Sequence, residues 1–170
     1  MRLTIAVLLL FTPCLAQQSE VAVRWTDVRK LGVEGQGWTD TKHPFDRFPA
    51  RAEGVVQQPV WELSQDSAGL RVRFVTGAAT IRARWTVRRA RLALPHMPAT
   101  GVSGVDLYAR DTAGKWKWVQ VTKPAPQEVR AEIIKDLPPG LREYAAYLPL
   151  YNGVDALEIG VPRGARFEGL

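Results

Sequence analysis

The stretch Gly104-Val105-Asp106-Leu107-Tyr108, continued by Ala109-Arg110-Asp111, indicates the fold most directly. Apolar and polar residues alternate along it with the period of two that a β-strand produces. Thr112-Ala113-Gly114 follows at once and is typical of a turn. The pattern predicts a strand that buries Leu107, with Val105 or Ala109, while Asp106 and Tyr108 contact neighbouring strands and turns.

Similar short runs along the chain predict further strands. They are bounded by Gly, Pro or Asn turns, and they lie at 21–28, 60–63, 70–75, 80–87, 92–94, 115–121, 128–134, 143–148 and 155–161. We expect runs 70–75 and 80–87 to form a hairpin around Gly77-Ala78-Ala79. Within the second run, one predicted face is apolar and belongs to the core: Ile81, Ala83, Trp85 and Val87.

The succession of short strands predicts the fold class. No segment shows a helical apolar stripe over three turns, so we expect an all-β, antiparallel β-sandwich of jelly-roll type. A chain of 170 residues with 46% hydrophobic and 24% charged residues is suited to one globular domain. We therefore expect a single sandwich domain over residues 17–170.

The first sixteen residues have the features of a signal peptide. Met1-Arg2 gives a positive start, an apolar run follows over 4–11, and Cys14-Leu15-Ala16 offers small residues for cleavage after Ala16. The run is too short to span a bilayer, which takes about 20 apolar residues. We expect export to the periplasm or the medium, without membrane association after cleavage. Lipid anchoring through Cys14 is the weaker alternative, because Phe11-Thr12-Pro13 does not fit such a site.

Cleavage would leave few metal-binding side chains. It removes the only cysteine, and His43 and His96 are the only imidazoles in the sequence. Structural and catalytic zinc sites need several cysteine or histidine ligands. We therefore expect no histidine-rich metal site and no cofactor. A calcium site with oxygen ligands in a loop is left open, although no cluster of carboxylates in the sequence favours it.

The string GVDLY resembles the signature of the GxDLY domain, a small β-sandwich at the N-terminus of bacterial two-domain SGNH (GDSL-type) esterases. Other strings are similar to that family and occur in the same order: GVEGQGW at 32–38, HPFDRFPA at 43–50, LPLYNGV at 148–154 and LEIGV at 157–161. The resemblance implies a non-catalytic accessory domain. Its partner would be an SGNH catalytic domain in the same chain, and the substrate an ester, with a carbohydrate ester as one candidate.

No catalytic residue can be transferred from the family to this sequence. The nucleophilic serine, the oxyanion-hole residues and the triad histidine of such esterases lie in the domain that follows the sandwich. Asp40 and His43 have the D-x-x-H spacing of the SGNH acid and base, but in the family that motif falls near the end of the catalytic domain. Catalysis also needs a serine in reach of the histidine. We expect this chain not to be an enzyme by itself.

The irregular segment 35–47 is the main candidate for a functional surface. It carries an aromatic ring, an imidazole, carboxylates and a guanidinium on a loop, where binding residues often occur. One hypothesis is that four of its residues form a docking or substrate lip: Trp38, His43, Asp46 and Arg47. The alternative is that Trp38 and Phe45 close the end of the sandwich while Asp46 and Arg47 pair at the surface.

The segment 70–92 contains seven arginines and no acidic residue, in a chain of net charge +6. The arginines are Arg71, Arg73, Arg82, Arg84, Arg88, Arg89 and Arg91. Three interpretations remain: a polyanion surface, a docking face, or a sheet face balanced by acids such as Asp106, Glu132 or Glu143. The third is the commonest, and the absence of a recognition motif argues against nucleic acid.

Four tryptophans raise the alternative of a free-standing carbohydrate-binding module: Trp61, Trp85, Trp116 and Trp118. Trp85 shares the predicted core face of its strand, so it is expected inside. Trp116 and Trp118 share one face of the strand 115–121 and form the candidate sugar platform, opposite Lys115 and Lys117.

Overall fold

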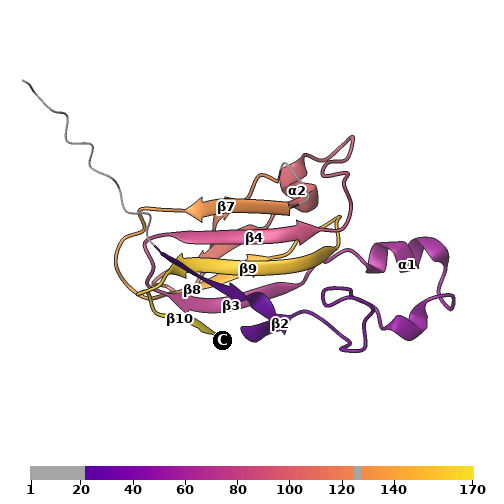
Figure 1. Ribbon diagram of the computed structural model, residues 1–170, viewed down its shortest axis with the longest axis horizontal. Helices are drawn as coiled ribbons and strands as arrows, with labels where there is room; N and C mark the ends of the chain where they lie inside the picture. Colours follow the sequence, from indigo (N-terminus) through magenta and orange to yellow (C-terminus); the bar gives the residue numbers. More distant parts are fainter. Residues whose placement is uncertain (1–21, 125–127) are drawn as a thin grey trace, which may run out of the picture.

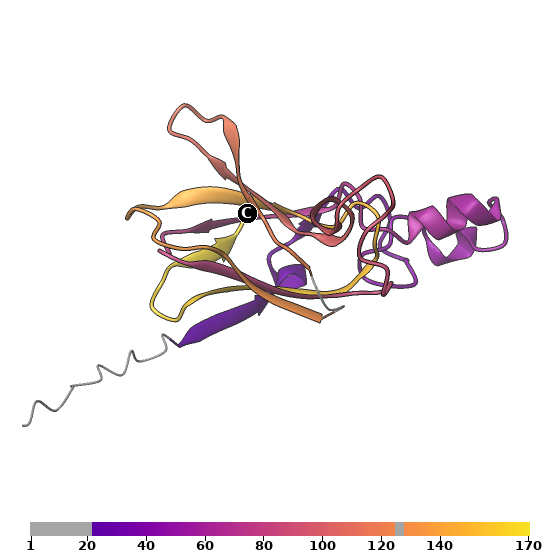
Figure 2. The ribbon, with the colours of Figure 1, turned by 90° about the horizontal axis from the view of Figure 1, so that it is seen from above.

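Two antiparallel β-sheets pack face to face in the computed structural model, which describes residues 22–124 and 128–170 (Figures 1 and 2). The four-stranded sheet has the order β1 (Val23–Asp27), β9 (Val154–Pro162), β4 (Ile81–Val87), β7 (Glu128–Ile134). The predicted antiparallel sandwich is confirmed. The jelly-roll assignment remains a prediction, and the predicted signal peptide lies outside the described residues.

The six-stranded sheet has the order β10 (Phe167–Gly169), β3 (Arg71–Thr76), β8 (Arg142–Tyr147), β5 (Asp106–Arg110), β6 (Trp116–Val121). Its sixth strand, β2 (Val33–Glu34), pairs with β3. Gly169 lies opposite Phe74 and Val33 opposite Val72, so β10 and β2 follow one another along one edge of β3.

The predicted hairpin at Gly77-Ala78-Ala79 is wrong. β3 belongs to the six-stranded sheet and β4 to the four-stranded sheet, so the chain crosses between sheets at this point. The connection lacks the Asn-Gly or Asp-Gly pair that closes tight hairpins. Instead, the buried Thr76 hydroxyl accepts a hydrogen bond from the Ala78 amide at 3.1 Å and donates one to the Arg166 carbonyl at 2.6 Å.

Two other short runs are not strands. The run 60–63 lies in helix α1 (Gln58–Ser64). Pro59 is in the first turn of this helix, where a backbone N–H would have no partner within the helix, so the missing N–H of proline costs nothing. Trp61 and Ser64, three residues apart, are buried on the same side of the helix. The run 92–94 contributes only an isolated bridge between Leu94 and Met97.

Helical structure in the described residues is otherwise limited to short segments. These are α2 (Ala99–Ser103) and the 3₁₀ turns η1 (Val28–Lys30) and η2 (Ala50–Ala52). None of the described helices is long and apolar enough to cross a membrane.

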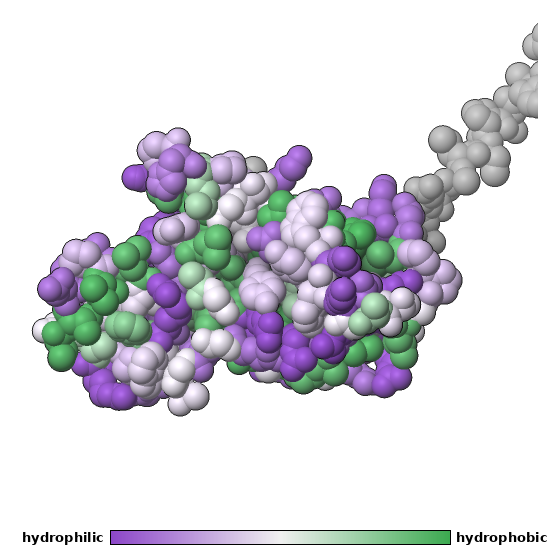
Figure 3. Space-filling model, turned by 180° about the vertical axis from the view of Figure 1, so that it is seen from behind, coloured by the Kyte–Doolittle hydropathy of each residue, from purple (hydrophilic) through white to green (hydrophobic). Residues whose placement is uncertain are grey.

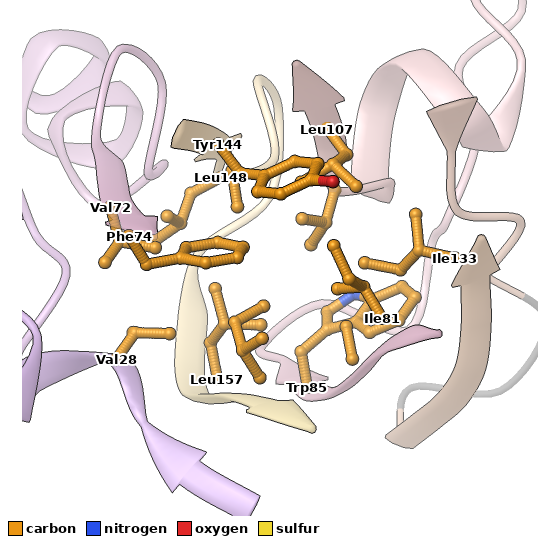
Figure 4. Close-up of a cluster of buried hydrophobic side chains, with 14 of the residues drawn as sticks. Val28, Val72, Phe74, Ile81, Trp85, Leu107, Ile133, Tyr144, Leu148 and Leu157 are labelled. Atoms are coloured by element: carbon orange, nitrogen blue, oxygen red, sulfur yellow. The ribbon is translucent and has the colours of Figure 1, made fainter. Parts of the chain in front are cut away.

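The core lies between the sheets and receives side chains from both (Figure 4). Leu107 and Tyr144 come from the six-stranded sheet, while Ile81, Trp85 and Leu157 come from the four-stranded sheet. Leu107 and Trp85 are buried as predicted. The Trp85 Nε1–H donates to the Ser103 carbonyl at 3.2 Å, which satisfies its polar atom inside the core.

Close packing of backbone atoms requires a glycine at the first position of GVDLY. Gly104 joins α2 to β5, and a Cβ atom there would lie 2.4 Å from the Thr100 carbonyl oxygen and 2.8 Å from the Thr122 carbonyl oxygen. Both neighbours are backbone atoms, which a side-chain rotation cannot move. The next residue is fixed as well, because the Val105 amide donates to the Thr122 hydroxyl at 2.7 Å.

We predict that Gly104→Ala destabilises the domain by about 1–3 kcal/mol, because the added methyl group overpacks a site with a rigid wall. Chemical denaturation of the purified domain measures the change. Gly37→Ala is the matched control, since a Cβ at Gly37 meets no atom within 4 Å. Equal stabilities for the two variants would contradict this account of the signature glycine.

Candidate functional site

One end of the sandwich carries the irregular segment 35–56 and α1 (Figure 1, right). Within this segment, Asp46 fixes the turn that begins at His43, and only 1% of Asp46 is exposed. Asp46 Oδ2 accepts from the His43 amide at 3.2 Å, and Oδ1 accepts from Arg88 at 3.1 Å. Arg88 also binds Asp155 in β9 at 3.0 Å, so the loop is tied to the four-stranded sheet.

A second set of contacts ties α1 to the same region. Arg47 Nε donates to the Asp66 carbonyl at 2.9 Å, and Arg89 forms an ion pair with the Asp66 carboxylate. Arg89 also donates to the Glu62 carbonyl in α1 at 3.2 Å. Burial raises the pKa of the Asp66 carboxyl above its ordinary value, against the opposing effect of Arg89.

The buried Asn152 side chain also belongs to this region. Its Oδ1 accepts from the Arg89 amide at 2.9 Å, and its Nδ2 donates to the Arg89 carbonyl at 3.0 Å and to the Ser103 hydroxyl at 3.1 Å. The backbone carbonyl of Asn152 accepts from the Ser67 amide at 3.2 Å. We call this set of residues the anchor network: Asp46, Arg47, Asp66, Arg88, Arg89 and Asn152.

The four predicted lip residues separate into two groups. Trp38 is 42% exposed, with its ring edge-on to Phe48 at 5.6 Å, and His43 is also exposed. Asp46 and Arg47 instead face inward as members of the anchor network, and they do not pair with each other at the surface. Phe45 is buried in the core cluster, as the alternative interpretation expected, whereas Trp38 does not close the sandwich.

The D-x-x-H spacing does not produce an acid–base pair. The Asp40 carboxylate forms an ion pair with Arg51. The Thr41 hydroxyl donates to the His43 carbonyl at 2.7 Å, so the turn orders the backbone there. Among the described residues, no serine hydroxyl hydrogen-bonds to the His43 ring, and no cluster of His, Cys, Asp or Glu could hold a metal ion.

Exposed apolar side chains gather at the α1 end. Val55 is 80% exposed and Leu63 52% exposed, and Val60 and Tyr151 are also exposed. We call these four residues the apolar tip. Figure 3, seen from behind, shows hydrophobic side chains over the α1 end at the left. Leu63 and Tyr151 face a common groove that Pro59, Arg89 and Leu94 also line.

Aromatic side chains gather on the outer face of the six-stranded sheet. Trp116 and Trp118 lie there as expected, with Arg110 over the Trp116 ring at 5.4 Å and Trp118 Nε1 donating to Asp106 Oδ1 at 3.0 Å. Trp116 also lines a concave site on this face, whereas Trp118 does not. The lining residues of this site define the aromatic groove: Asp106, Tyr108, Trp116, Tyr147, Leu148 and Leu150.

Tyr108 and Tyr147 line the aromatic groove but were not predicted from the sequence as site residues, although the strand pattern indicates where Tyr108 lies. Alternation along the strand places Tyr108 on the face opposite the buried Leu107. Tyr147 reaches the same face because β8 pairs with β5, with Tyr147 opposite Asp106. The two tyrosine rings then meet edge to face, with centroids 5.5 Å apart. Only the strand pairing, which is not local in sequence, brings them together.

The arginine-rich segment is largely neutralised by acids on neighbouring strands. Glu34 binds Arg71 and Arg73, Glu143 binds Arg73 and Arg110, and the other sheet holds the pairs Arg82–Glu132 and Arg84–Glu158. This arrangement supports the interpretation as a balanced sheet face. Asp106 does not take part as expected, because it accepts from Trp118.

The fold and its surfaces define a β-sandwich domain whose exposed features are an apolar end and an aromatic groove. A family model described as GxDLY, the N-terminus of SGNH hydrolase-type esterases, matches residues 23–167. The chain belongs to this family. No curated protein matches the chain.

Solved structures that resemble the domain include the following two. A Bacteroides ovatus ATCC 8483 protein described as a GDSL-like lipase matches with a TM-score of 0.81 and 27% identity, over 87% of this chain and 43% of its own. A salicylyl-acyltransferase from a tetracycline biosynthetic pathway shares the fold, with a TM-score of 0.57 and 16% identity, over 87% of this chain and 42% of its own. This chain therefore spans less than half the length of either protein. Homologues pair the domain with a catalytic SGNH domain in the same chain.

We predict that Asn152→Ala destabilises the domain by about 2 kcal/mol, because the part-buried amide and carbonyl of Arg89 and the buried hydroxyl of Ser103 lose a partner. Amide hydrogen exchange should also show faster exchange in segment 35–47, since the anchor network would loosen. Gln58→Ala, on the exposed side of α1, is the control and should change stability by less than about 0.5 kcal/mol. Unchanged exchange in the Asn152 variant would contradict the anchoring role.

A pH dependence follows from Glu34. Hydrogen bonds from Arg73 and Arg71 lower the pKa of its carboxyl below the ordinary value of 4.5, so its stabilising effect is present above that pH and is lost as the pH falls through the lower, folded-state pKa. We predict that Glu34→Gln lowers the free energy of unfolding at pH 7 by no more than about 1 kcal/mol. Denaturation curves should show this difference shrinking below pH 4.5. At pH 7, about 1 M salt should reduce it as well.

Proposed function

We propose that this chain is the exported, non-catalytic N-terminal accessory domain of an SGNH-type ester hydrolase, which docks against the catalytic domain and shapes the approach of substrate. The observation that carries the proposal is the direction of the last strand towards the apolar end of the sandwich. Export is supported by the signal peptide predicted at 1–16, and the proposed substrate class is an ester, with a carbohydrate ester as one candidate.

β10 runs antiparallel to β3 and towards the start of that strand. Gly169 lies opposite Phe74, and the Leu170 amide donates to the Arg73 carbonyl at 3.3 Å. β3 begins at Arg71, a short connection after α1, at the end of the sandwich that carries segment 35–56 (Figure 1). In homologues the catalytic domain follows this domain in the chain. A domain that follows Leu170 in the same way would begin near this end of the sandwich.

The apolar tip has the character of a docking surface. α1 turns Trp61 inward and leaves Val60 and Leu63 exposed, with Val55 just ahead of the helix. Exposed apolar side chains that gather in one region of a soluble domain can mark an interaction site. The anchor network fixes the helix beneath it, so little conformational entropy is lost when a partner binds.

Carbohydrate binding is the second candidate function. It is favoured by a separate observation, the aromatic groove on the outer face of the six-stranded sheet.

We predict that Leu63→Glu uncouples the two domains in a chimera where residues 23–169 replace the matched region of the Bacteroides ovatus protein. The introduced carboxylate would be buried in the docked interface, whereas the isolated domain should keep its stability because Leu63 is 52% exposed. Calorimetry should show the coupled unfolding of the chimera separating into two transitions, and KM for p-nitrophenyl acetate should change.

Leu141→Glu provides the matched control. Leu141 is also 52% exposed, but it precedes Arg142, which pairs with Thr76 at the opposite end of β3. It should therefore leave coupling and kinetics unchanged. If both variants behave like the unsubstituted chimera, the apolar tip is not the docking surface.

A further inference from the structure

The aromatic groove is an assembled site that the docking proposal does not use. Tyr108 from β5, Trp116 from β6 and Tyr147 from β8 supply its rings, Leu148 is buried, and Leu150 is 45% exposed. The three rings are only partly buried, and the groove opens on the outer face of the sheet, away from the core. Rings that merely filled the core would be covered, as Trp85 is.

We infer that the aromatic groove binds a pyranose ring of a neutral polysaccharide, with the aromatic side chains against the sugar ring and Asp106 accepting a hydrogen bond from a sugar hydroxyl. A pyranose presents C–H groups on its ring faces and hydroxyls around its edge. The C–H groups carry partial positive charge and suit the negative faces of aromatic rings. The hydroxyls need fixed polar partners at the side of the site.

Two polar groups of the groove are free to serve as such partners. Asp106 Oδ1 is held by Trp118 Nε1 at 3.0 Å, while Oδ2 accepts no hydrogen bond from the residues that the structure describes. The Tyr147 hydroxyl accepts from Arg71 at 2.9 Å, which leaves its own proton to donate. The groove therefore offers one fixed acceptor and one fixed donor beside its rings.

The rings are held in place before any ligand binds. Arg110 lies over Trp116 and binds Glu143 at 2.8 Å, and Arg71 lies over the Tyr147 ring at 5.7 Å while it binds Glu34 at 2.9 Å. Tyr108 packs edge-on against Tyr147. Pre-organised rings reduce the entropy that binding costs. Because each of these guanidinium groups is paired with an acid and Asp106 adds a carboxylate, a neutral glycan suits the groove better than an anionic one.

Affinity electrophoresis of the purified domain in native gels tests this inference. The probes are four neutral polysaccharides: hydroxyethylcellulose, xylan, galactomannan and soluble starch. We expect at least one to retard the wild-type domain. Trp116→Ala should weaken that binding at least tenfold, and Asp106→Asn should weaken it by a smaller factor because the amide oxygen is a poorer acceptor.

Trp38→Ala is the matched control, because Trp38 is an exposed tryptophan outside the groove. It should leave retardation unchanged, and circular dichroism should show both tryptophan variants folded. Migration of the wild-type domain without retardation by any probe would overturn the inference, as would equal losses in the two tryptophan variants. If no probe binds and Trp116→Ala uncouples the domains of the chimera as Leu63→Glu is expected to, the groove is a docking surface instead.

Discussion

A single buried amide joins the parts of the molecule that have irregular structure. The Asn152 side chain satisfies the amide and carbonyl of Arg89, just past β4, and binds the hydroxyl of Ser103 at the end of α2. A buried polar group without a partner is costly, so these segments are stable only together. Arg89 in turn holds Asp66 and the carbonyl of Glu62 in α1. The position of the helix thus depends on an amide far from it in sequence.

This arrangement gives the two exposed surfaces different kinds of support. The apolar tip rests on the anchor network, where buried charges meet their partners. The aromatic groove rests on a regular sheet, where Glu34 and Glu143 bridge arginines across neighbouring strands at the surface. Removing one partner of a buried ion pair destabilises the fold strongly, whereas each exposed ion pair contributes little to stability. Substitutions beneath the tip should therefore affect folding, and substitutions in the groove can affect binding alone.

Alternation in the sequence was sufficient to predict the sandwich and the burial of Leu107 and Trp85, because each strand must turn one face to a single core. It failed where pairing is not local: β3 and β4 share no sheet, although four residues separate them. It failed at 60–63 because four residues do not distinguish a strand from a turn of helix. Asp46 and Arg47 looked functional as polar loop residues, since nothing nearby in sequence reveals Arg88 or the carbonyl of Asp66 as their partners.

The segment LPLYNGV brings these surfaces next to each other. Leu148 and Leu150 line the aromatic groove, Tyr151 belongs to the apolar tip, and Asn152 is the centre of the anchor network. Because Leu150 and Tyr151 are consecutive, a sugar held in the groove and a domain docked on the tip would be only a short distance apart. In the accessory role proposed for it, the domain would then hold a polysaccharide beside the catalytic domain and raise the local concentration of its ester groups. The same segment that stabilises the fold would thereby couple binding to hydrolysis.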